Sequence, residues 1–367
     1  MRISVMLGGV AVLALSGLVY FKGAAHPAPP RPRPKNVILL IGDGMGLTQV
    51  SAGLYSNHDR LNVERFPVTG MMKTHSASAL ITDSAAGATA FSCGCKTRNG
   101  YIGVSANKKP CFTLLEEAEQ RGLATGLAAS CSITHATPAS FIAHVPDRAD
   151  MEQIAADFLK TSVDLLIGGG QKYFEARKSD ARDLRREMEE KGYAVSSFKD
   201  KPLQELNFDP AQPNVWFSAW EEPASVLKGR DYLPVAARKA PAFLARRSDK
   251  GFFLMLEGSQ IDWACHGNKA PEAIAEMLDF DKAIGEILDF AKQDGQTLVI
   301  VTADHETGGM SIQEGSVMDS LEIAFVTGYH TATMVPVFAY GPGSEQFHGV
   351  MDNTEIYTRI RLALDWQ

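Results

Sequence analysis

The sequence predicts an α/β fold, a three-layer α/β/α sandwich around a largely parallel central sheet. From residue 35 onward, short apolar runs typical of buried strands alternate with patterns typical of helices. Acidic residues follow several of these runs directly, at the carboxyl ends of strands where ligands bind in such sheets. The chain of 367 residues, 45% of them hydrophobic, is long enough for one large domain or two ordinary ones.

Six apolar runs are the expected strands, and together they predict a sheet covered on both faces. They are residues 37–41, 122–129, 163–169, 251–258, 297–305 and 336–341. Helical patterns occupy the intervals between and after them. The clearest are residues 84–93, 180–191, 271–292 and 352–364.

The first residues have a different character from the rest of the chain. Arg2 precedes an apolar run over residues 5–21, and a proline-rich stretch follows. We expect residues 1–25 to be a signal peptide or an N-terminal membrane anchor, and residues 26–34 to be a linker. The run is long for a cleaved signal and short for a membrane span, so both alternatives stay open. Either one predicts an exported protein, periplasmic or extracellular, with a single domain over residues 35–367.

Charge and cysteine content restrict the partners and the redox chemistry. The formal net charge is −7 and no basic stripe is present, so nucleic-acid binding is not expected. The five cysteines are Cys93, Cys95, Cys111, Cys131 and Cys265. In an exported protein one pair would form a disulfide, Cys111 with either Cys93 or Cys95, and at least one thiol would be left over.

Three of the expected strands end in acids: Asp43, Glu257, and Asp304 with His305. A single acid at a strand end is usually a turn former. Three at one edge of a sheet repel each other unless protons or metal ions lie between them. Asp43 stands within a glycine loop, residues 42–46, whose backbone suits a phosphate. A cation between this acid and the phosphate would remove the conflict.

Two further segments carry candidate chemistry. Asp262 and His266 are four residues apart, so on a helix they would share one face and could share a metal ion. A surface pair is the commoner explanation, but the position just after Glu257 favours a metal. Ser84, preceded by Asp83, stands where a helix would start. It is either an ordinary capping residue or a nucleophile at the positive end of the helix. No histidine is near it in sequence and there is no G-x-S-x-G motif, so a metal would have to activate it.

Taken in order, these segments resemble the alkaline phosphatases. The matching stretches are IGDGMG, TDSAAGATA, THATPASF, LEGSQIDWACH, VTADHETGG and YHTATMVPVFAYGP. The resemblance runs from Lys35 to about Leu364. It implies hydrolysis of phosphate monoesters to an alcohol and inorganic phosphate, through a phosphoserine on Ser84, with broad substrate specificity. It also implies two zinc ions and one magnesium ion as cofactors.

The resemblance assigns roles residue by residue. One zinc ion would be held by Asp43, Asp304 and His305. The other zinc ion would be held by Asp262, His266 and His330. The magnesium ion would be held by Asp43, Glu257 and Thr137. Arg148 would grip the phosphate, and His135 and Asp83 would support the site from behind these residues. The same ligands could hold cobalt or other divalent ions.

One departure from the family concerns assembly. Only residues 306–329 separate His305 from His330, where the family often carries a crown-like subdomain near the dimer interface. We therefore expect the crown to be reduced or absent, and a monomer to be slightly favoured over a homodimer.

Three other functions fit the sequence less well than phosphate monoester hydrolysis. A sulfatase would need a Cys/Ser-x-Pro-x-Arg motif. A phosphodiesterase or phosphomutase would not be expected to keep Glu257 and Thr137. A binding protein without turnover would not need Ser84.

Overall fold

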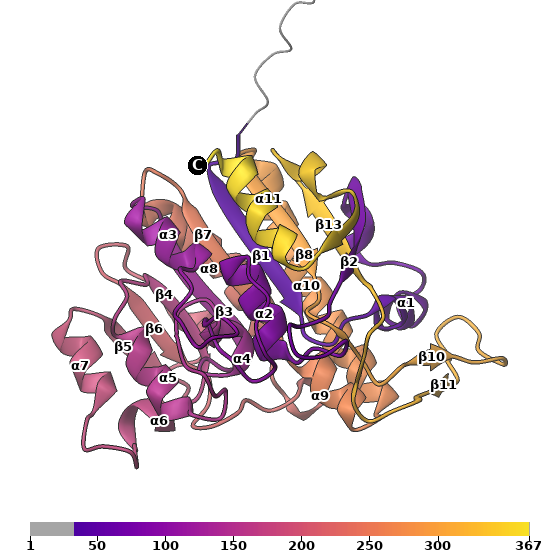
Figure 1. Ribbon diagram of the computed structural model, residues 1–367, viewed down its shortest axis with the longest axis horizontal. Helices are drawn as coiled ribbons and strands as arrows, with labels where there is room; N and C mark the ends of the chain where they lie inside the picture. The colour runs from indigo at the N-terminus through magenta and orange to yellow at the C-terminus, as the bar shows by residue number, and fades with distance from the viewer. Residues whose placement is uncertain (1–32, 367) are drawn as a thin grey trace, which may run out of the picture. The chain divides into compact units, whose positions relative to one another are not determined.

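The computed structural model describes residues 33–366, in which the predicted apolar runs form the middle of a ten-stranded sheet (Figure 1). All six predicted strands are confirmed: β1 (Asn36–Gly42), β3 (Ala124–Ser132), β4 (Leu165–Gly169), β7 (Phe252–Gly258), β8 (Thr297–Thr302) and β13 (Val335–Tyr340). The sheet order is β14-β2-β13-β8-β1-β7-β3-β4-β6-β5. Four strands of this sheet were not predicted: β2 (Val68–Lys73), β5 (Ala194–Ser197), β6 (Asn214–Phe217) and β14 (Gly349–Asp352).

Strand direction confirms the largely parallel sheet. Within the ten-stranded sheet, only β13 runs against its neighbours, β8 and β2. At the centre, Ile41 of β1 lies opposite Glu257 of β7 and Thr302 of β8. This register places the carboxyl ends of the three central strands together, so the side chains that follow them meet at one edge of the sheet.

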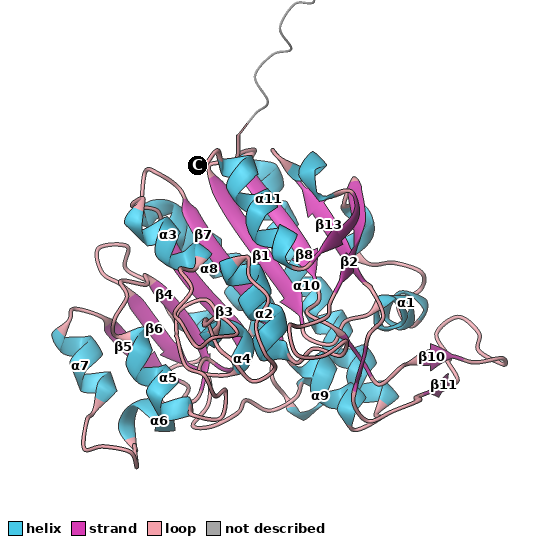
Figure 2. Cartoon of the chain, viewed as in Figure 1, coloured by secondary structure: helices cyan, strands magenta, loops and turns pink. Residues whose placement is uncertain are grey.

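Helices cover the sheet on both faces, as Figure 2 shows. α8 (Leu233–Arg247) and α10 (Ala270–Asp294) pack together behind it, with α1 (Leu47–Tyr55) and α9 (Gln260–His266) against α10. In front lie α2 (Ser84–Cys93), α3 (Leu114–Gln120), α4 (Ala136–Ala139) and α11 (Thr354–Leu364). β1, β7 and β8 are buried along their whole length because both faces are covered. The predicted three-layer sandwich is confirmed.

The predicted helices also form, with shifted ends. The helix expected at residues 84–93 is α2, with the same bounds, and the one expected at 271–292 lies within α10. The one expected at 352–364 begins two residues later, as α11, because Asp352 ends β14. The charged stretch at 180–191 forms only α7 (Leu184–Glu190). Two further helices follow strands of the sheet: α5 (Met151–Phe158) lies between β3 and β4, and α6 (Lys172–Glu175) comes after β4.

The segment between His305 and His330 is small. It holds two short ladders: β9 (Glu306–Thr307) with β12 (His330–Thr331), and β10 (Ser311–Ile312) with β11 (Ile323–Ala324). No larger subdomain is present in this interval, in agreement with the predicted reduction of the crown. The β9–β12 ladder places His330 opposite Thr307, so His330 lies near the carboxyl end of β8.

The predicted signal or anchor segment, and most of the linker, lie outside the described residues. Among residues 33–366, no helix is both long enough and apolar enough to cross a membrane.

Candidate active site

The acids that follow the central strands meet at the carboxyl edge of the sheet. Asp43, Asp304 and His305 are completely buried. His305 Nε2 lies 3.4 Å from Asp43 Oδ1 and 3.2 Å from Asp304 Oδ2. The three residues proposed for the first zinc ion therefore lie together, with ligand atoms close enough to share one ion.

The glycine loop after β1 is shaped by this packing. Gly44 has a φ of +72°, a conformation that side chains disfavour, and its N–H donates to Asp304 Oδ1 at 3.2 Å. A Cβ atom on Gly44 would stand 2.7 Å from Thr307 Oγ1 and 2.9 Å from the Asp262 backbone. Glycine is required here because the chain leaving β1 passes directly against Thr307 and Asp262.

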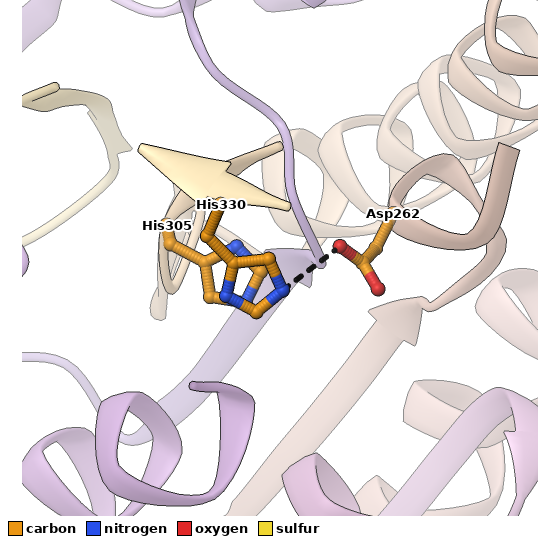
Figure 3. Close-up of side chains that lie close together, drawn as sticks. All are labelled: Asp262, His305 and His330. Carbon is orange, nitrogen blue, oxygen red and sulfur yellow. Dashed lines mark ion pairs between the residues drawn. The ribbon is translucent and has the colours of Figure 1, made fainter. Parts of the chain in front are cut away.

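The second set comes from α9 and β12. His266 Nε2 lies 3.3 Å from Asp262 Oδ2 and 3.0 Å from His330 Nε2, and His330 Nε2 lies 3.5 Å from Asp262 Oδ1. Figure 3 shows the Asp262 carboxylate facing His330, whose ring overlaps that of His305. The two rings stack at a centroid distance of 3.5 Å. Asp262, His305 and His330 also have ligand atoms close enough to share an ion, so His305 lies between the two sets.

Backbone carbonyls fix the orientation of the outer imidazoles. His330 Nδ1 lies 2.8 Å from the Thr82 carbonyl oxygen, and His266 Nδ1 lies 2.8 Å from that of Gly328. Nδ1 is therefore the donor in both rings, and Nε2 faces the site. Such second contacts are typical of metal-binding histidines. Burial lowers the pKa of His330 and of His305 to about 4, which keeps these rings neutral, as metal ligands must be.

Several buried oxygens at this edge have no hydrogen-bond partner. They are both carboxylate oxygens of Asp43, Asp304 Oδ2, Glu257 Oε1 and Thr137 Oγ1. Burial raises the pKa of Asp43 well above its usual range, and the charges of Asp304, Asp262 and Glu257 raise it further. Burial likewise raises the pKa of Asp304 to about 6. Buried polar atoms are almost always satisfied, so this cluster is chemically incomplete without cations or protons.

Glu257 and Thr137 form the third part of the site. Burial raises the pKa of Glu257 to about 8, and the charge of Asp304 acts in the same direction. Thr137 lies in α4, after β3, and is completely buried. His135 precedes α4, and its ring stands edge-on to Trp263 at a centroid distance of 5.7 Å. Carboxylate and hydroxyl oxygens side by side are the donors that magnesium prefers.

Ser84 is the first residue of α2 and points at the same cluster. Its Oγ lies 3.3 Å from His305 Nε2, and the residue is 2% exposed. The Asp83 side chain caps the helix by accepting the Ala86 N–H at 3.0 Å. A Cβ on Gly87 would stand 3.0 Å from Asp304 Cβ, so small residues let α2 approach the acids closely. The sequence showed no histidine near Ser84, and the fold supplies one from the end of β8.

Arg148 is held beside Ser84 by Asp83. Its Nη1 donates to Asp83 Oδ2 at 3.0 Å, and the Gly100 N–H donates to the same oxygen at 2.9 Å. The Arg148 N–H in turn donates to the Gly100 carbonyl at 2.8 Å. Asp83 therefore both caps α2 and supports Arg148, and the sequence indicated a capping residue and a supporting residue of the site but not its contact with Arg148.

Sequence reasoning missed Thr307 altogether. This buried hydroxyl donates to Asp262 Oδ1 and lies 3.2 Å from His305 Nδ1, so it touches both candidate ligand sets. Its place two residues after His305, within VTADHETGG, was the available signal.

Comparison with known proteins agrees with this geometry. The sequence profile of the alkaline phosphatase family matches residues 34–325. The chain belongs to the alkaline phosphatase family. It is 34% identical to alkaline phosphatase 4 of Bacillus subtilis, over 88% of this chain and 87% of that protein. It is 31% identical to the alkaline phosphatase of Escherichia coli, over 90% and 86%.

A solved family member matches the fold as well. The alkaline phosphatase of the Antarctic bacterium TAB5 is 42% identical, with a TM-score of 0.86 over 91% of this chain and 99% of that one. A variant of that enzyme is described with Mg bound in its M3 site. Membership in this family identifies the chain as a phosphoric monoester hydrolase, and phosphate monoesters are the substrates that fit it.

Proposed function

We propose that the chain hydrolyses phosphate monoesters through a phosphoserine formed on Ser84, with two zinc ions and one magnesium ion as cofactors. The observation that carries this proposal is the position of Ser84 Oγ. It lies at the N-terminus of α2 and 3.3 Å from His305, beside acids whose oxygens lack partners. A serine that only capped a helix would have no reason to face this cluster.

The residues present fit the three ions. The unpartnered oxygens of Asp43 and Asp304, with the neutral ring of His305, suit one zinc ion, and the set of Asp262, His266 and His330 suits the other. Glu257, Thr137 and Asp43 offer only oxygen, as magnesium requires. When bound, these cations lower the pKa of a hydroxyl or water and stabilise charge on phosphoryl oxygens.

The chain's own groups position the substrate. The N-terminus of α2 presents backbone N–H groups and the positive end of the helix dipole, which favour a phosphate at Ser84. Arg148 can bind two phosphate oxygens with its planar fork, and Asp83 holds the guanidinium in place. Ser84 Oγ takes the phosphoryl group as the alcohol leaves, and water then cleaves the phosphoserine in a second displacement.

Three accompanying proposals concern the enzyme's setting. Broad specificity follows because the site's groups recognise phosphate rather than the leaving alcohol. A monomer is favoured slightly over a homodimer because the segment between His305 and His330 is small. Export, with a cleaved signal or a retained anchor, rests on the apolar run over residues 5–21.

The test is hydrolysis of an aryl phosphate at mildly alkaline pH by the wild type and by Ser84→Ala. The variant should lose at least about a thousandfold in kcat/KM while keeping its melting temperature. Ser51→Ala is the matched control, since that hydroxyl bonds only to a carbonyl of its own helix. Acid-quenched wild type should carry phosphate on Ser84, as read by peptide mass. A metal-replete wild type that leaves the monoester intact would overturn the proposal.

A further inference from the structure

Three cysteine thiols gather at the end of α2 that lies away from Ser84. Cys93 is the last residue of α2, Cys95 follows the helix cap, and Cys111 comes from the loop before α3. Cys95 Sγ lies 3.1 Å from Cys111 Sγ, and Cys93 Sγ lies 3.5 Å from the Cys111 carbonyl oxygen and also interacts with the Cys111 thiol. All three residues are partly exposed, and none of the five cysteines is in a disulfide.

The backbone on both sides holds the two facing thiols in place. Gly94 caps α2 with a φ of +66°, and a Cβ there would stand 2.4 Å from the Tyr357 ring. This turn directs Cys95 away from the helix axis. On the other side, the Cys111 N–H donates to the Gly103 carbonyl at 2.9 Å, so residues 103–111 fold back on themselves. The thiols meet because two ordered turns face each other.

We propose that Cys95 and Cys111 form a disulfide when the protein meets a disulfide oxidant, and that Cys93 stays a thiol. The linkage would close the loop from Cys95 to Cys111. The sequence left both Cys93 and Cys95 open as the partner of Cys111, and the proposal chooses Cys95.

Thiol chemistry supports the choice of partners. The thiols of Cys93 and Cys95 donate hydrogen bonds that lower the pKa of Cys111 to about 6, so it is the thiolate nucleophile. Burial raises the pKa of Cys93, which also lies at the negative end of α2. In the first step, Cys111 thiolate attacks one sulfur of a small disulfide RSSR and releases RS⁻. Cys95 thiolate then attacks the Cys111 sulfur and releases the second RS⁻. Two protein thiols are oxidised and one RSSR is reduced to two RSH.

The loop that the disulfide would close includes a residue that holds Asp83 and Arg148 in place. Gly100 lies within it, and its N–H and carbonyl bind Asp83 and Arg148 respectively. Thr89 of α2 is bonded to the same loop through Tyr101 and Gly103. A disulfide would therefore make local opening of the Gly100 segment rarer. The link to phosphate binding rests on the proposed function, but the disulfide itself is tested without measuring activity.

The first measurement is a thiol count and peptide map of the full protein after exposure to oxidised glutathione. Of the five thiols, two should be lost, leaving three. Cleavage after Lys96 and Lys108 separates Cys111 from a peptide that carries both Cys93 and Cys95. The two peptides should be joined in the wild type and in Cys93→Ser, and separate in Cys111→Ser and Cys95→Ser.

The second measurement is thermal unfolding with and without a reductant. Oxidation should raise Tm by on the order of 5 °C in the wild type and in Cys93→Ser, and leave Cys95→Ser unchanged. The amide protons of Gly100 and Arg148 should exchange at least about tenfold more slowly in the oxidised protein.

Four outcomes would overturn the proposal. They are five free thiols after oxidation, full-yield linkage in Cys95→Ser, a linkage that includes Cys131 or Cys265, or thiols protected by a soft metal ion that a chelator releases.

Discussion

Two clusters of buried carboxylates in this enzyme differ in whether a cation of the protein neutralises them. At the active site, Asp43, Glu257 and Asp304 are completely buried, and several of their oxygens have no partner. Beneath the loop before α8, Arg230 Nη2 meets Glu276 Oε2 at 2.6 Å and Asp279 Oδ2 at 2.8 Å. Glu276 also accepts the Val226 N–H at 2.9 Å.

The difference shows which cluster is structural and which is functional. The Arg230 cluster carries its own cation and ties a loop to α10, so folding alone pairs its charges, although Arg230 Nε and Nη1 have no hydrogen-bond partner. The active-site acids are placed by three central strands, and among residues 33–366 the cationic side chain that lowers the pKa of Asp43 is Arg148, which Asp83 already holds. Unpaired buried charge is costly, so its presence at one edge of the sheet marks a site that ligands complete.

Removal of divalent cations should produce the largest effect and separate the two clusters. Chelation should lower kcat/KM by at least about 10⁴-fold, because charge on the transferred phosphoryl group is no longer stabilised. Zinc and magnesium together should restore the activity, measured with an aryl phosphate. Far-ultraviolet circular dichroism should show that the fold, with its Arg230 cluster, survives. If the chelated protein kept full activity, the active-site acids would not need cations, and the proposed difference between the two clusters would be wrong.

Arg230→Met should destabilise the protein by about 3–5 kcal/mol, because two buried carboxylates lose the cation that both of them pair with. Urea unfolding measures this, and the activity of the folded fraction should be unchanged. The matched control is Arg238→Met, which breaks the exposed pair with Glu286 and should cost less than about 1 kcal/mol. Equal losses for the two variants would show that the buried cluster is not structural.

Asp43→Asn should act in opposite directions on activity and on metal-free stability. Activity should fall about 10²-fold, since a charge shared by two proposed cations is lost. The metal-free variant should be more stable than the metal-free wild type by about 1–2 kcal/mol, because repulsion from Asp304 and Glu257 is relieved. Urea unfolding after chelation checks the second effect, and a less stable metal-free variant would refute it.

The last prediction concerns the pH dependence of stability in the metal-free protein. Glu257 keeps its proton up to about pH 8 in the folded chain, but releases it near its usual pKa when unfolded. Between these values the folded state binds more protons, so stability should fall as pH rises, by about 1.4 kcal/mol per pH unit. The decline should end above about pH 8. Glu257→Gln should remove the part of this slope that Glu257 causes and leave the parts due to Asp43 and Asp304, whereas Glu286→Gln, at a partly exposed position, should leave the slope unchanged.

Much of the fold followed from local patterns. The six long apolar runs were strands because continuous burial on both faces demands such residues. Three of the missed sheet strands are short: β5, β6 and β14 have four residues each, and β5 and β14 are only partly buried. The fourth, β2, has six residues but is also only partly buried. Four residues carry too little periodicity to be distinguished from a loop, so only pairing with neighbours makes them strands.

The candidate site divides in the same way. Asp43, Asp304 and Asp262 were recognisable because acids at strand ends, or one helical turn from a histidine, are local signals. Three contacts were not visible in the sequence: Ser84 with His305, Asp83 with Arg148, and Thr307 with Asp262.

By itself, the sequence determined the family, the central strands and the chemical types of the candidate ligands. These depend on residue type and short-range spacing, which are read directly. Only the tertiary structure decided that Thr82 orients His330 across 248 positions, and that the Cys95 sulfur lies 3.1 Å from that of Cys111. Such contacts depend on strand order, register and helix packing, which are properties of the whole chain.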